Sequence, residues 1–480
     1  YVVRDYFDVF DEVYCPKEHT FEFLQNVLTE VMELFPSHYI HIGGDECPKK
    51  AWKKCAHCQH LMKWEGLPNE EALQSWFIHR IEQFVNSKGR DIIGWDEILE
   101  GGLAPNATVM SWRGEKGGIE AAHQRHKVIM TPGKKCYLDY YQESPEFAPL
   151  AIGGFLPLDT VYNYNPLPAE LTPEEQAYII GVQANIWGEY IQTPEYFEYM
   201  AFPRLLAMSE VQWTQPEHKD FESFARRLDK EFERLDYCGV NACRNFYEVN
   251  QAGAWNKSQQ TYEVTLNTFC PDADIYYAVN DSTVNTSSSL YKTPIPLDED
   301  ATVYSAVYRD GKPLGKVTRK SFAVNKATGC DYTCNPAAGW EHLNEGFGLT
   351  DGRRGYARDM RRWISFYQDT VQIVVELKKP QKVKEVAFSS LWRPVNEIWP
   401  ARAMSVSVSM DGQTFIPVGT KRLTYDFSLT EGTRFPASLS FAETEATFVR
   451  LELLSGGLCP KGYFHEGLQS ELAIDEIEIY

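Results

Sequence analysis

The sequence lacks any run of about 18 apolar residues, the length that a membrane-spanning helix needs. It also lacks an excess of positive charge, because 47 Lys and Arg residues stand against 67 Asp and Glu residues, for a formal net charge of −20. The phosphates of a nucleic acid or of an anionic membrane would repel such a chain. We therefore exclude a transmembrane segment and a nucleic-acid partner, and a neutral ligand fits the composition better.

The sequence has no regular cysteine framework and no targeting segment. Its 11 cysteines are an odd number at irregular spacing, which argues against a full set of disulfides. The chain begins YVVRDYFDVF, without an initiator Met, a basic segment or an apolar signal core. We expect any targeting peptide to lie outside the given residues, and the amino terminus to be cut rather than native.

Up to about residue 245, short apolar runs alternate with segments of helical periodicity, a pattern typical of βα units around a parallel sheet. A (β/α)₈ barrel needs eight strands to close. We therefore predict an incomplete TIM barrel, the last five βα units, with three further strands before residue 1; an open five-stranded sheet is the alternative. The predicted strands are Tyr39–Gly43, Asp91–Trp95, Thr108–Trp112, Lys127–Thr131 and Ile179–Ile186, and the predicted helices are Thr20–Phe35, Glu70–Lys88 and Phe221–Leu235.

The rest of the chain changes to short alternating runs separated by Gly, Pro, Asn and Asp. Runs such as TYEVTL and TVYSAVYRDG, and later VQIVVEL and MSVSVSM, predict antiparallel strands. We predict two all-β sandwiches here. The expected domains are therefore 1–245, 246–328 and 329–480.

The motif HIGGDEC, at His41–Cys47, stands where the first predicted strand ends. Two glycines allow the backbone to approach a ligand closely, and carboxylates at the carboxyl end of a barrel strand face the mouth of the barrel. A pair such as Asp45 and Glu46 can divide the work of catalysis, with one group protonated as a general acid and the other ionised. The alternative is an acidic helix N-cap without a catalytic role.

Aromatic residues and carboxylates also follow the later predicted strands, in the motifs GWDE, SWRG, YLD and NIWGEY. Together they predict an aromatic-walled cup with a few polar groups, which suits a hexose. One Trp is more often part of a core, but three at equivalent positions are harder to explain as packing. The side chains of this cup are Trp95, Trp112, Tyr137, Asp139, Trp187 and Glu189.

In this order, HIGGDE, GWDE, SWRG, YLD and WGEY resemble glycoside hydrolase family 20, the β-N-acetylhexosaminidases, over roughly residues 1–245. The resemblance implies hydrolysis of terminal non-reducing N-acetyl-β-D-hexosamines by a substrate-assisted retaining mechanism, in which the acetamido oxygen of the substrate attacks the anomeric carbon. It makes Glu46 the general acid and base, and Asp45 the group that orients the acetamido group. It needs no cofactor for catalysis.

The same resemblance assigns the substrate-binding residues. It implies that Tyr137 donates a hydrogen bond to the acetamido carbonyl, and that Asp139 and Glu189 hold sugar hydroxyls. An Arg on the first strand and a His on the third-strand loop of the family cannot be assigned here, so we expect the piece as given to be inactive. The residues implied to bind substrate are His41, Trp95, Trp112, Tyr137, Asp139, Trp187 and Glu189.

The segment CPKKAWKKCAHCQH, residues 47–60, contains four residues that could bind zinc: Cys47, Cys55, Cys58 and His60. The spacing C-x₇-C-x₂-C-x-H is not a standard one, and Cys47 directly follows the carboxylate pair. We therefore favour an insertion loop, with a disulfide, over a metal site. Similarly, we expect Cys330 and Cys334 to form a local bridge or to be free thiols.

Residues 246–328 resemble the small chitobiase-type β domain of such enzymes. Residues 329–480 resemble a discoidin-like domain of the coagulation-factor type C class, through the LTDG turn and the terminal LAIDEIEIY. Such domains bind sugars and hold a structural calcium ion, for which Asp351 and Glu476 would be oxygen ligands. A plain turn residue and a surface Glu are the alternative.

The resemblance implies a secreted, periplasmic or cell-surface protein whose partners are N-acetylhexosamine-terminated glycans. Two rival functions remain. The first is a non-catalytic carbohydrate-binding protein that keeps the sugar cup, against which the intact Asp45 and Glu46 argue. The second is a glycosidase with a two-carboxylate mechanism, but adjacent Asp and Glu side chains diverge and would not easily flank one bond at ~5 Å.

Overall fold

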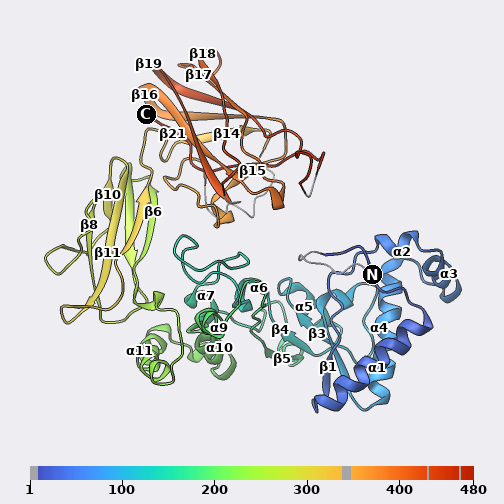
Figure 1. Ribbon diagram of the computed structural model, residues 1–480. Coiled ribbons are helices and arrows are strands. Elements are labelled where there is room, and N and C mark those ends of the chain that lie inside the picture. Colours follow the sequence, from blue (N-terminus) through green and yellow to red (C-terminus); the bar gives the residue numbers. More distant parts are fainter. Residues whose placement is uncertain (1–8, 338–347, 430–431, 464–465) are drawn as a thin grey trace. The chain divides into compact units, whose positions relative to one another are not determined.

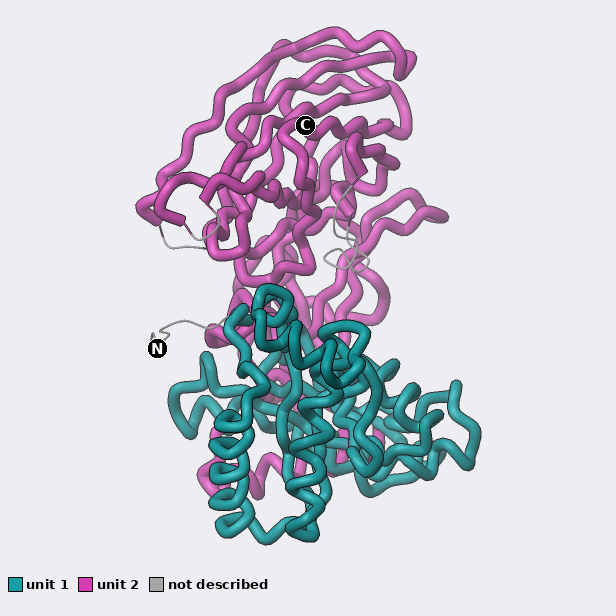
Figure 2. The backbone as a smooth tube through the Cα atoms, turned by 90° about the vertical axis from the view of Figure 1, so that its right-hand side faces the viewer, with its two compact units in different colours: residues 1–142, 155–221 teal, residues 143–154, 222–480 magenta. Residues whose placement is uncertain are grey.

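The computed structural model describes residues 9–337, 348–429, 432–463 and 466–480 (Figure 1). The chain divides into two compact units, which Figure 2 shows in different colours. Unit 1 comprises residues 1–142 and 155–221, and unit 2 comprises residues 143–154 and 222–480. In the described part of the chain, no helix is both long and apolar enough to cross a membrane.

Unit 1 contains a parallel sheet of five strands that lie in the order in which they follow one another in the chain. Helices separate most of these strands, so unit 1 has the arrangement of a TIM-barrel-like fold. The register places Tyr39 opposite Asp91 and Gly94 opposite Val109. The strands are β1 (Tyr39–His41), β2 (Asp91–Trp95), β3 (Thr108–Ser111), β4 (Val128–Met130) and β5 (Ile179–Val182).

The longest helices of unit 1 are α1 (Glu18–Leu34) and α4 (Glu70–Ser87), which pack on each other. Phe21 contacts Phe77 at a ring-centroid distance of 4.7 Å, and the Asn69 side chain caps α4 by accepting from the N–H of Ala72. The other helices are α2 (Lys50–Lys54), α3 (Ala56–Glu65), η1 (Asp96–Leu99), α5 (Lys116–His123), α6 (Gly133–Cys136), α7 (Leu158–Tyr162), α8 (Pro173–Gln176), α9 (Pro194–Ala201), α10 (Arg204–Trp213) and η2 (Pro216–His218).

The five strands and the three long helices predicted from the sequence are all present, and they differ only at their ends. The strand β1 ends at His41 because Gly43 and Gly44 have φ values of +73° and +95°, which no extended strand allows. The strand β5 ends at Val182, before the predicted Ile186.

Unit 2 is rich in β-structure and also contains the helix α11 (Phe221–Tyr237), of which only the first residue belongs to unit 1. Its first two sheets have the strand orders β10-β7-β6 and β12-β11-β8-β9, with β13 paired to β11. Their elements are η3 (Asn245–Tyr247), β6 (Asn250–Asn256), β7 (Thr261–Asn267), β8 (Asp274–Val279), β9 (Ser289–Leu290), β10 (Ile295–Leu297), β11 (Ala301–Arg309), β12 (Lys312–Pro313) and β13 (Thr318–Phe322).

The last sheet of unit 2 has eight strands, in the order β15-β20-β16-β19-β17-β18 with β14 and β21 also paired to β16. Its two longest strands pair antiparallel, and register shifts interrupt them after Glu376 and Val383. Its elements are β14 (Asp331–Asn335), η5 (Met360–Arg362), β15 (Ile364–Phe366), β16 (Thr370–Trp392), η6 (Pro394–Asn396), β17 (Ala403–Ser409), β18 (Ile416–Arg422), β19 (Thr433–Leu454), β20 (Leu472–Ile474) and β21 (Glu478–Ile479).

Both β-rich parts expected from the sequence lie within unit 2. Direct hydrogen bonds join them: Ile479 donates its N–H to the side chain of Asn325 at 3.0 Å, and Arg353 donates to the carbonyl of Gly253 at 3.0 Å. The expected domain boundaries after residues 245 and 328 stay predictions.

Candidate active site

The segment after β1 carries the predicted carboxylate pair. The sheet pairing extends two residues past the strand, because the N–H of Ile42 donates to Ile93 and the N–H of Trp95 donates to Gly43, each at 2.9 Å. The chain then turns through Gly43 and Gly44, and Glu46 itself has a φ of +45°. A positive φ is uncommon for a residue with a side chain, so the fold holds Glu46 in a backbone conformation that its own Cβ atom disfavours.

The protonation of Glu46 is shifted by its surroundings. Desolvation raises the pKa of Glu46, and the negative charges of Asp45 and Glu97 raise it further. Desolvation lowers the pKa of His41, against the effect of Asp45, and the His41 ring lies edge-on to Trp95 at 4.8 Å. A carboxyl group that keeps its proton nearer to neutral pH is suited to general-acid catalysis.

A second acidic pair, Asp96 and Glu97, follows β2 and is almost fully buried. Glu97 accepts a hydrogen bond from the indole N–H of Trp112 at 2.9 Å, and Asp96 accepts from the guanidinium of Arg113 at 2.8 Å. Arg113 also reaches Glu100 at 3.3 Å. Because Trp112 and Arg113 follow β3, these bonds tie the ends of two neighbouring strands together and orient the Trp112 ring.

Aromatic rings from four strand ends form one contiguous cluster. Trp95 and Trp187 have ring centroids 6.0 Å apart, Tyr137 and Trp187 are 6.3 Å apart, and Trp112 stacks on Tyr137 at 6.3 Å with an interplanar angle of 24°. Trp95 and Tyr137 are buried, whereas Trp187 is 41% exposed. The cluster therefore presents an accessible aromatic surface to solvent. His41 extends it to the carboxylate pair.

Tyr137 is held at the end of β5 by a short bridge to Asn185. Leu138 donates its N–H to the carbonyl of Asn185 at 2.7 Å, and Asn185 donates its N–H to Cys136 at 2.9 Å. The side chain of Asn185 donates to Thr131 at 2.8 Å. Burial raises the pKa of Tyr137, so its hydroxyl stays protonated and available as a hydrogen-bond donor.

Asp139 is 3% exposed, and neither of its carboxylate oxygens has a hydrogen-bond partner among the described residues. Burial raises the pKa of Asp139 to about 6, and the charge of Glu189 acts in the same direction. The backbone N–H of Trp187 and the charge of Arg204 oppose this effect. A buried carboxylate with unused acceptors is costly to the fold, and it is suited to receive hydroxyl groups from a ligand.

Arg204 supports the loop that carries Tyr137 and Asp139. It is fully buried, and its guanidinium donates to the carbonyls of Tyr140 and Leu156 at 2.9 Å and to Met200 at 2.7 Å. Five donors in a fixed fork allow one Arg to bind several carbonyls at once. Arg204 thus joins the loop after β4 to the helices that follow β5.

The structure places the predicted carboxylates and aromatic residues at the carboxyl ends of β1 to β5 or in the segments that follow them, in one unit. Sequence reasoning assigned no role to Glu97, Asn185 or Arg204. The first two stood within the quoted motifs GWDE and NIWGEY, whereas Arg204 carried no signal before its burial was known. The predicted residues so placed are His41, Asp45, Glu46, Trp95, Trp112, Tyr137, Asp139, Trp187 and Glu189.

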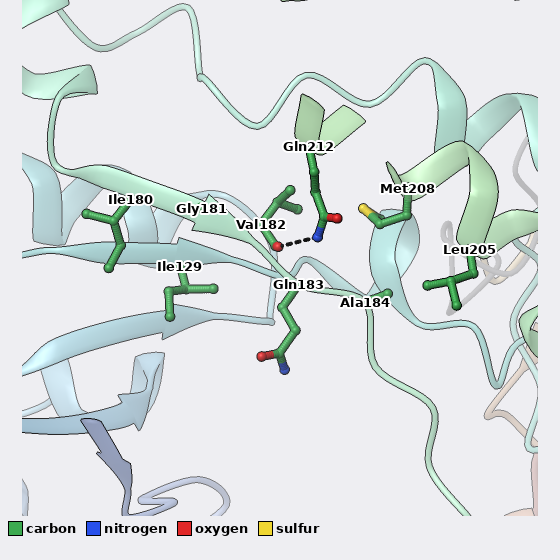
Figure 3. Close-up of a pocket in the computed structure, with 9 residues that line it drawn as sticks. All are labelled: Ile129, Ile180, Gly181, Val182, Gln183, Ala184, Leu205, Met208 and Gln212. Carbon is green, nitrogen blue, oxygen red and sulfur yellow. Dashed lines mark hydrogen bonds between the residues drawn. The ribbon is translucent and has the colours of Figure 1, made fainter. Parts of the chain in front are cut away.

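A cavity of about 450 Å³ lies elsewhere in unit 1, between β4, β5 and α10 (Figure 3). Ile129, Ile180, Leu205 and Met208 line it, and Gln212 donates to the carbonyl of Val182 at its border. None of the residues that line it is acidic, basic or His. It offers no group for acid–base chemistry, so the candidate active site is the set of strand ends rather than this cavity.

The two residues predicted to bind calcium lie in unit 2. Glu476 accepts the N–H groups of Asp351 and Gly352 at 3.1 and 2.9 Å, and Asp351 accepts those of Gly348 and Arg353 at 3.0 Å. Each of the four carboxylate oxygens therefore accepts a hydrogen bond from a backbone N–H group. Calcium usually takes six to eight oxygen ligands, so these two residues alone do not fit the ion, and the calcium site stays a prediction.

The amino-terminal part of the chain is similar to known enzymes. Residues 2–216 match the model of "Glycosyl hydrolase family 20, catalytic domain", and residues 250–318 match that of "Chitobiase/beta-hexosaminidase C-terminal domain". The chain is 55% identical over 232 residues to Beta-hexosaminidase of Porphyromonas gingivalis and 37% identical over 195 residues to Beta-hexosaminidase of Vibrio furnissii.

These alignments cover 48% and 40% of this chain but 30% and 32% of the two relatives, so the chain spans about a third of their length. A solved GH20 exo β-N-acetylglucosaminidase of Vibrio harveyi is 34% identical, with a TM-score of 0.44 over 47% of this chain and 36% of that chain. By these matches, residues 2–216 are similar to the catalytic domain of glycosyl hydrolase family 20, and residues 250–318 to the C-terminal domain of chitobiases and β-hexosaminidases.

Proposed function

We propose that this protein hydrolyses terminal non-reducing N-acetyl-β-D-hexosamine residues by a substrate-assisted retaining mechanism. One observation carries the proposal: Asp45 and Glu46 are adjacent in the segment that follows β1, and desolvation, together with the charges of Asp45 and Glu97, raises the pKa of Glu46. Glu46 donates its proton to the leaving oxygen as the glycosidic bond breaks. It then accepts a proton from the water that attacks the intermediate.

The substrate supplies the nucleophile. Its acetamido oxygen attacks the anomeric carbon and forms a bond as the bond to the leaving group breaks, which gives an oxazolinium ion. Asp45 orients the acetamido group and stabilises the positive charge that develops on it. Tyr137, whose raised pKa keeps its hydroxyl protonated, donates a hydrogen bond to the acetamido oxygen. Water then opens the oxazolinium ion with retention of configuration.

The surrounding residues bind the sugar. Trp95, Trp112 and Trp187 form the walls around the N-acetyl group and the apolar face of the ring, as their contacts with Tyr137 and one another support. Asp139 accepts hydrogen bonds from sugar hydroxyls, which its two unused buried oxygens favour. Glu189 holds a further hydroxyl.

In the whole protein, we propose that β1–β5 are the last five βα units of a (β/α)₈ barrel. The remaining residues then form a chitobiase-type β domain, 246–328, and a discoidin-like domain, 329–480. The partners are N-acetylhexosamine-terminated glycans outside the cell, so the protein is secreted, periplasmic or on the cell surface. The similarity to the family 20 catalytic domain and to two β-hexosaminidases supports this assignment.

The test is the Glu46→Gln variant in the full-length protein, assayed on substrates with poor and with activated leaving groups. A general acid matters most when the leaving oxygen needs a proton, and such assistance is typically worth about 10²–10⁴-fold. We expect a loss of this size on an alkyl or glycosyl β-N-acetylhexosaminide and a much smaller loss on an activated aryl glycoside. Equal losses on both substrates would remove Glu46 from the acid role.

Trp187→Phe is the matched control, because Trp187 belongs to the aromatic wall and carries no charge that acts on Glu46. It should reduce turnover of both substrate types by a similar factor. A thiazoline analogue of the oxazolinium ion should bind tightly to the wild-type protein. Binding of N-acetylhexosamines with no turnover of any glycoside would favour the rival function, a non-catalytic carbohydrate-binding protein.

A further inference from the structure

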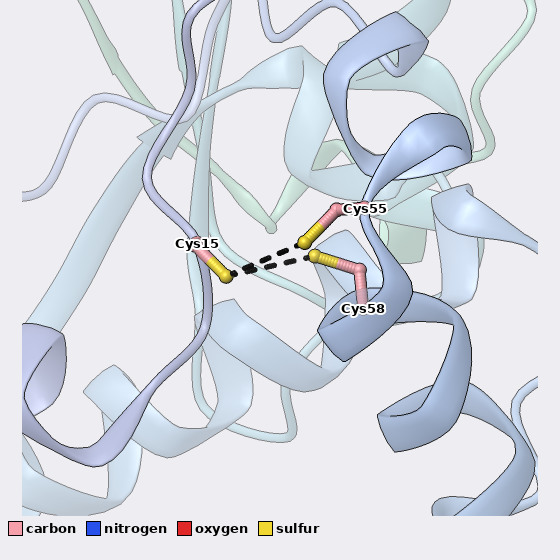
Figure 4. A group of neighbouring side chains, drawn as sticks. All are labelled: Cys15, Cys55 and Cys58. Carbon is pink, nitrogen blue, oxygen red and sulfur yellow. Dashed lines mark hydrogen bonds between the residues drawn. The ribbon is translucent and has the colours of Figure 1, made fainter.

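Three cysteines from two separate segments meet beside the candidate active site, in unit 1 (Figure 4). The sulfur of Cys15 lies 3.9 Å from that of Cys55 and 3.8 Å from that of Cys58, and all three sulfurs lie within 4.8 Å of one another. Cys58 is buried, whereas Cys15 and Cys55 are partly exposed. We define the thiol cluster as Cys15, Cys55 and Cys58.

Local structure explains how Cys55 and Cys58 come together. They form a C-x₂-C motif at the start of α3, where Cys55 is the N-cap residue and Cys58 lies in the first turn. The backbone N–H groups of Cys58 and His57 lower the pKa of Cys55 by hydrogen bonding to its sulfur. The motif therefore presents two sulfurs on one side of the helix start.

The segment that carries Cys15 contacts α1, α2 and α3. The carbonyl of Cys15 accepts from the hydroxyl of Thr20 at 2.8 Å, and the indole of Trp52 donates to the carbonyl of Tyr14 at 3.0 Å. The ring of His57 lies 3.3 Å from the carbonyl of Pro16. These contacts hold Cys15 against the C-x₂-C motif, although 40 residues separate it from Cys55.

The distances agree with a metal site rather than with a disulfide. A disulfide has a sulfur–sulfur bond of about 2.05 Å, whereas Cys15, Cys55 and Cys58 are free thiols. Zinc bound to thiolates has Zn–S bonds of about 2.3 Å, so two sulfurs of one tetrahedron lie about 3.8 Å apart. The distances from the sulfur of Cys15 to those of Cys58 and Cys55, 3.8 and 3.9 Å, match that edge.

We propose that Cys15, Cys55 and Cys58 bind one Zn²⁺ ion through their sulfur atoms, with a water molecule in the fourth position. Soft thiolate ligands select zinc over the hard cations magnesium and calcium. The partial exposure of Cys15 and Cys55 leaves room for the water. The apolar residues around the thiol cluster, Trp52, Met62 and Leu73 among them, form a small core that would protect the thiolate bonds.

The site gives the ion a structural role next to the candidate active site. It would join the residues around Cys15 to α2 and α3, which are the first elements after Glu46. The same region is anchored by Lys49, which donates to the carbonyl of Cys47 at 2.9 Å and lies 3.4 Å from Glu100. Zinc would therefore stabilise the segment from which the carboxylate pair projects.

The sequence-based interpretation of this region was wrong in two respects. It favoured a disulfide, whereas the cysteines are free. It also named Cys47 and His60 as the companions of Cys55 and Cys58, whereas the third sulfur that the structure places beside them is that of Cys15. Spacing along the chain cannot reveal a ligand that the fold brings in from 40 residues away.

The test is the metal content of the full chain, purified without chelator and analysed by elemental mass spectrometry. We expect one zinc per chain. After replacement by Co²⁺, we expect a thiolate-to-cobalt charge-transfer band and visible bands of tetrahedral intensity. X-ray absorption at the zinc edge should show three sulfurs at about 2.3 Å and one lighter ligand. The last two measurements use the unaltered protein and do not depend on a variant that folds.

Variants identify the ligands. Cys15→Ser, Cys55→Ser and Cys58→Ser should each lose the zinc, whereas Cys47→Ser and His60→Ala should keep one zinc per chain. Exposed Cys238 provides a further control, because Cys238→Ser should change the thiol count and not the metal content. Three outcomes would overturn the proposal: metal-free protein with freely titrating thiols, a disulfide within the thiol cluster, or zinc that persists in Cys15→Ser.

Discussion

The buried carboxylate of Asp139 allows a sharp prediction, because burial raises its pKa and its ionised form therefore lowers the stability of the fold. In the folded protein burial raises the pKa of Asp139 to about 6, from an ordinary value of 3.8. The folded state therefore binds more protons than the unfolded state between these two pH values. Stability must then fall as the pH rises from about 4 to about 6, and this loss is complete above the folded pKa.

The size of the effect follows from the difference between the two pKa values. A difference of about two pH units corresponds to about 3 kcal/mol in the free energy of unfolding. The Asp139→Asn variant is close in shape to the protonated acid and does not titrate. We expect wild type and variant to have similar stability at pH 4, and the variant to gain about 3 kcal/mol relative to wild type by pH 7.

Urea unfolding at several pH values measures this gain. Far-ultraviolet circular dichroism suits the experiment, because the described α-helices other than α11 lie in unit 1 and report on it. Asp96→Asn is the matched control: Asp96 is equally buried but is bonded to Arg113 at 2.8 Å. Its replacement leaves the guanidinium without that partner, so this variant should not gain stability relative to wild type as the pH rises.

The same Asp139→Asn variant should bind N-acetylhexosamines less tightly, because an amide accepts fewer hydroxyl hydrogen bonds than a carboxylate. Higher stability at neutral pH together with weaker binding would show that the charge of Asp139 destabilises the fold and that the protein uses this charge to bind its ligand. A difference in stability that stays constant from pH 4 to pH 7 would refute the reasoning. It would mean that ionisation of Asp139 does not lower the free energy of unfolding.

Two further predictions concern packing and a buried ion pair. Gly94→Ala would place a Cβ atom 2.7 Å from the side chain of Ile98 and 3.2 Å from the carbonyl of Gly43. Because these contacts are too close, the variant should destabilise unit 1 by about 1–3 kcal/mol, which should appear as a lower urea concentration at the unfolding midpoint. Asp475→Ala would remove the buried carboxylate that pairs with Arg434 at 2.9 Å. We expect the free energy of unfolding of unit 2 to fall by about 3–5 kcal/mol, which should appear as faster proteolysis of its eight-stranded sheet. An unchanged rate of proteolysis would contradict the prediction.

The strands of unit 1 could be predicted because their signal is local. Each parallel strand is a short apolar run, and Gly, Trp or a carboxylate stands within a few residues of the point where the chain leaves the sheet. The same alternation placed residues such as Trp95 and Trp187 at strand ends, and a parallel sheet brings such ends to one side. The ends of strands were less predictable, because positive φ values at residues such as Gly43 decide them.

Groups that act through distant contacts could not be predicted. The burial of Arg204 and its bonds to several carbonyls depend on the packing of α10 on the loop after β4. Asp351 and Glu476 have the oxygen atoms that calcium prefers, yet the fold directs backbone N–H groups at them. The residue type alone does not distinguish these two uses of a carboxylate.

The sequence by itself determined the order of the strands, the residues at their carboxyl ends and the resemblance that links them to a reaction, because each depends on neighbours along the chain. Only the tertiary structure decided which distant side chains interact electrostatically and which lie close enough together to coordinate one ion. Glu97 raises the pKa of Glu46, and Cys15 joins Cys55 and Cys58, because the fold closes the distance between segments about 40 to 50 residues apart. Electrostatic and coordination interactions act through space, so their partners appear only when the chain is folded.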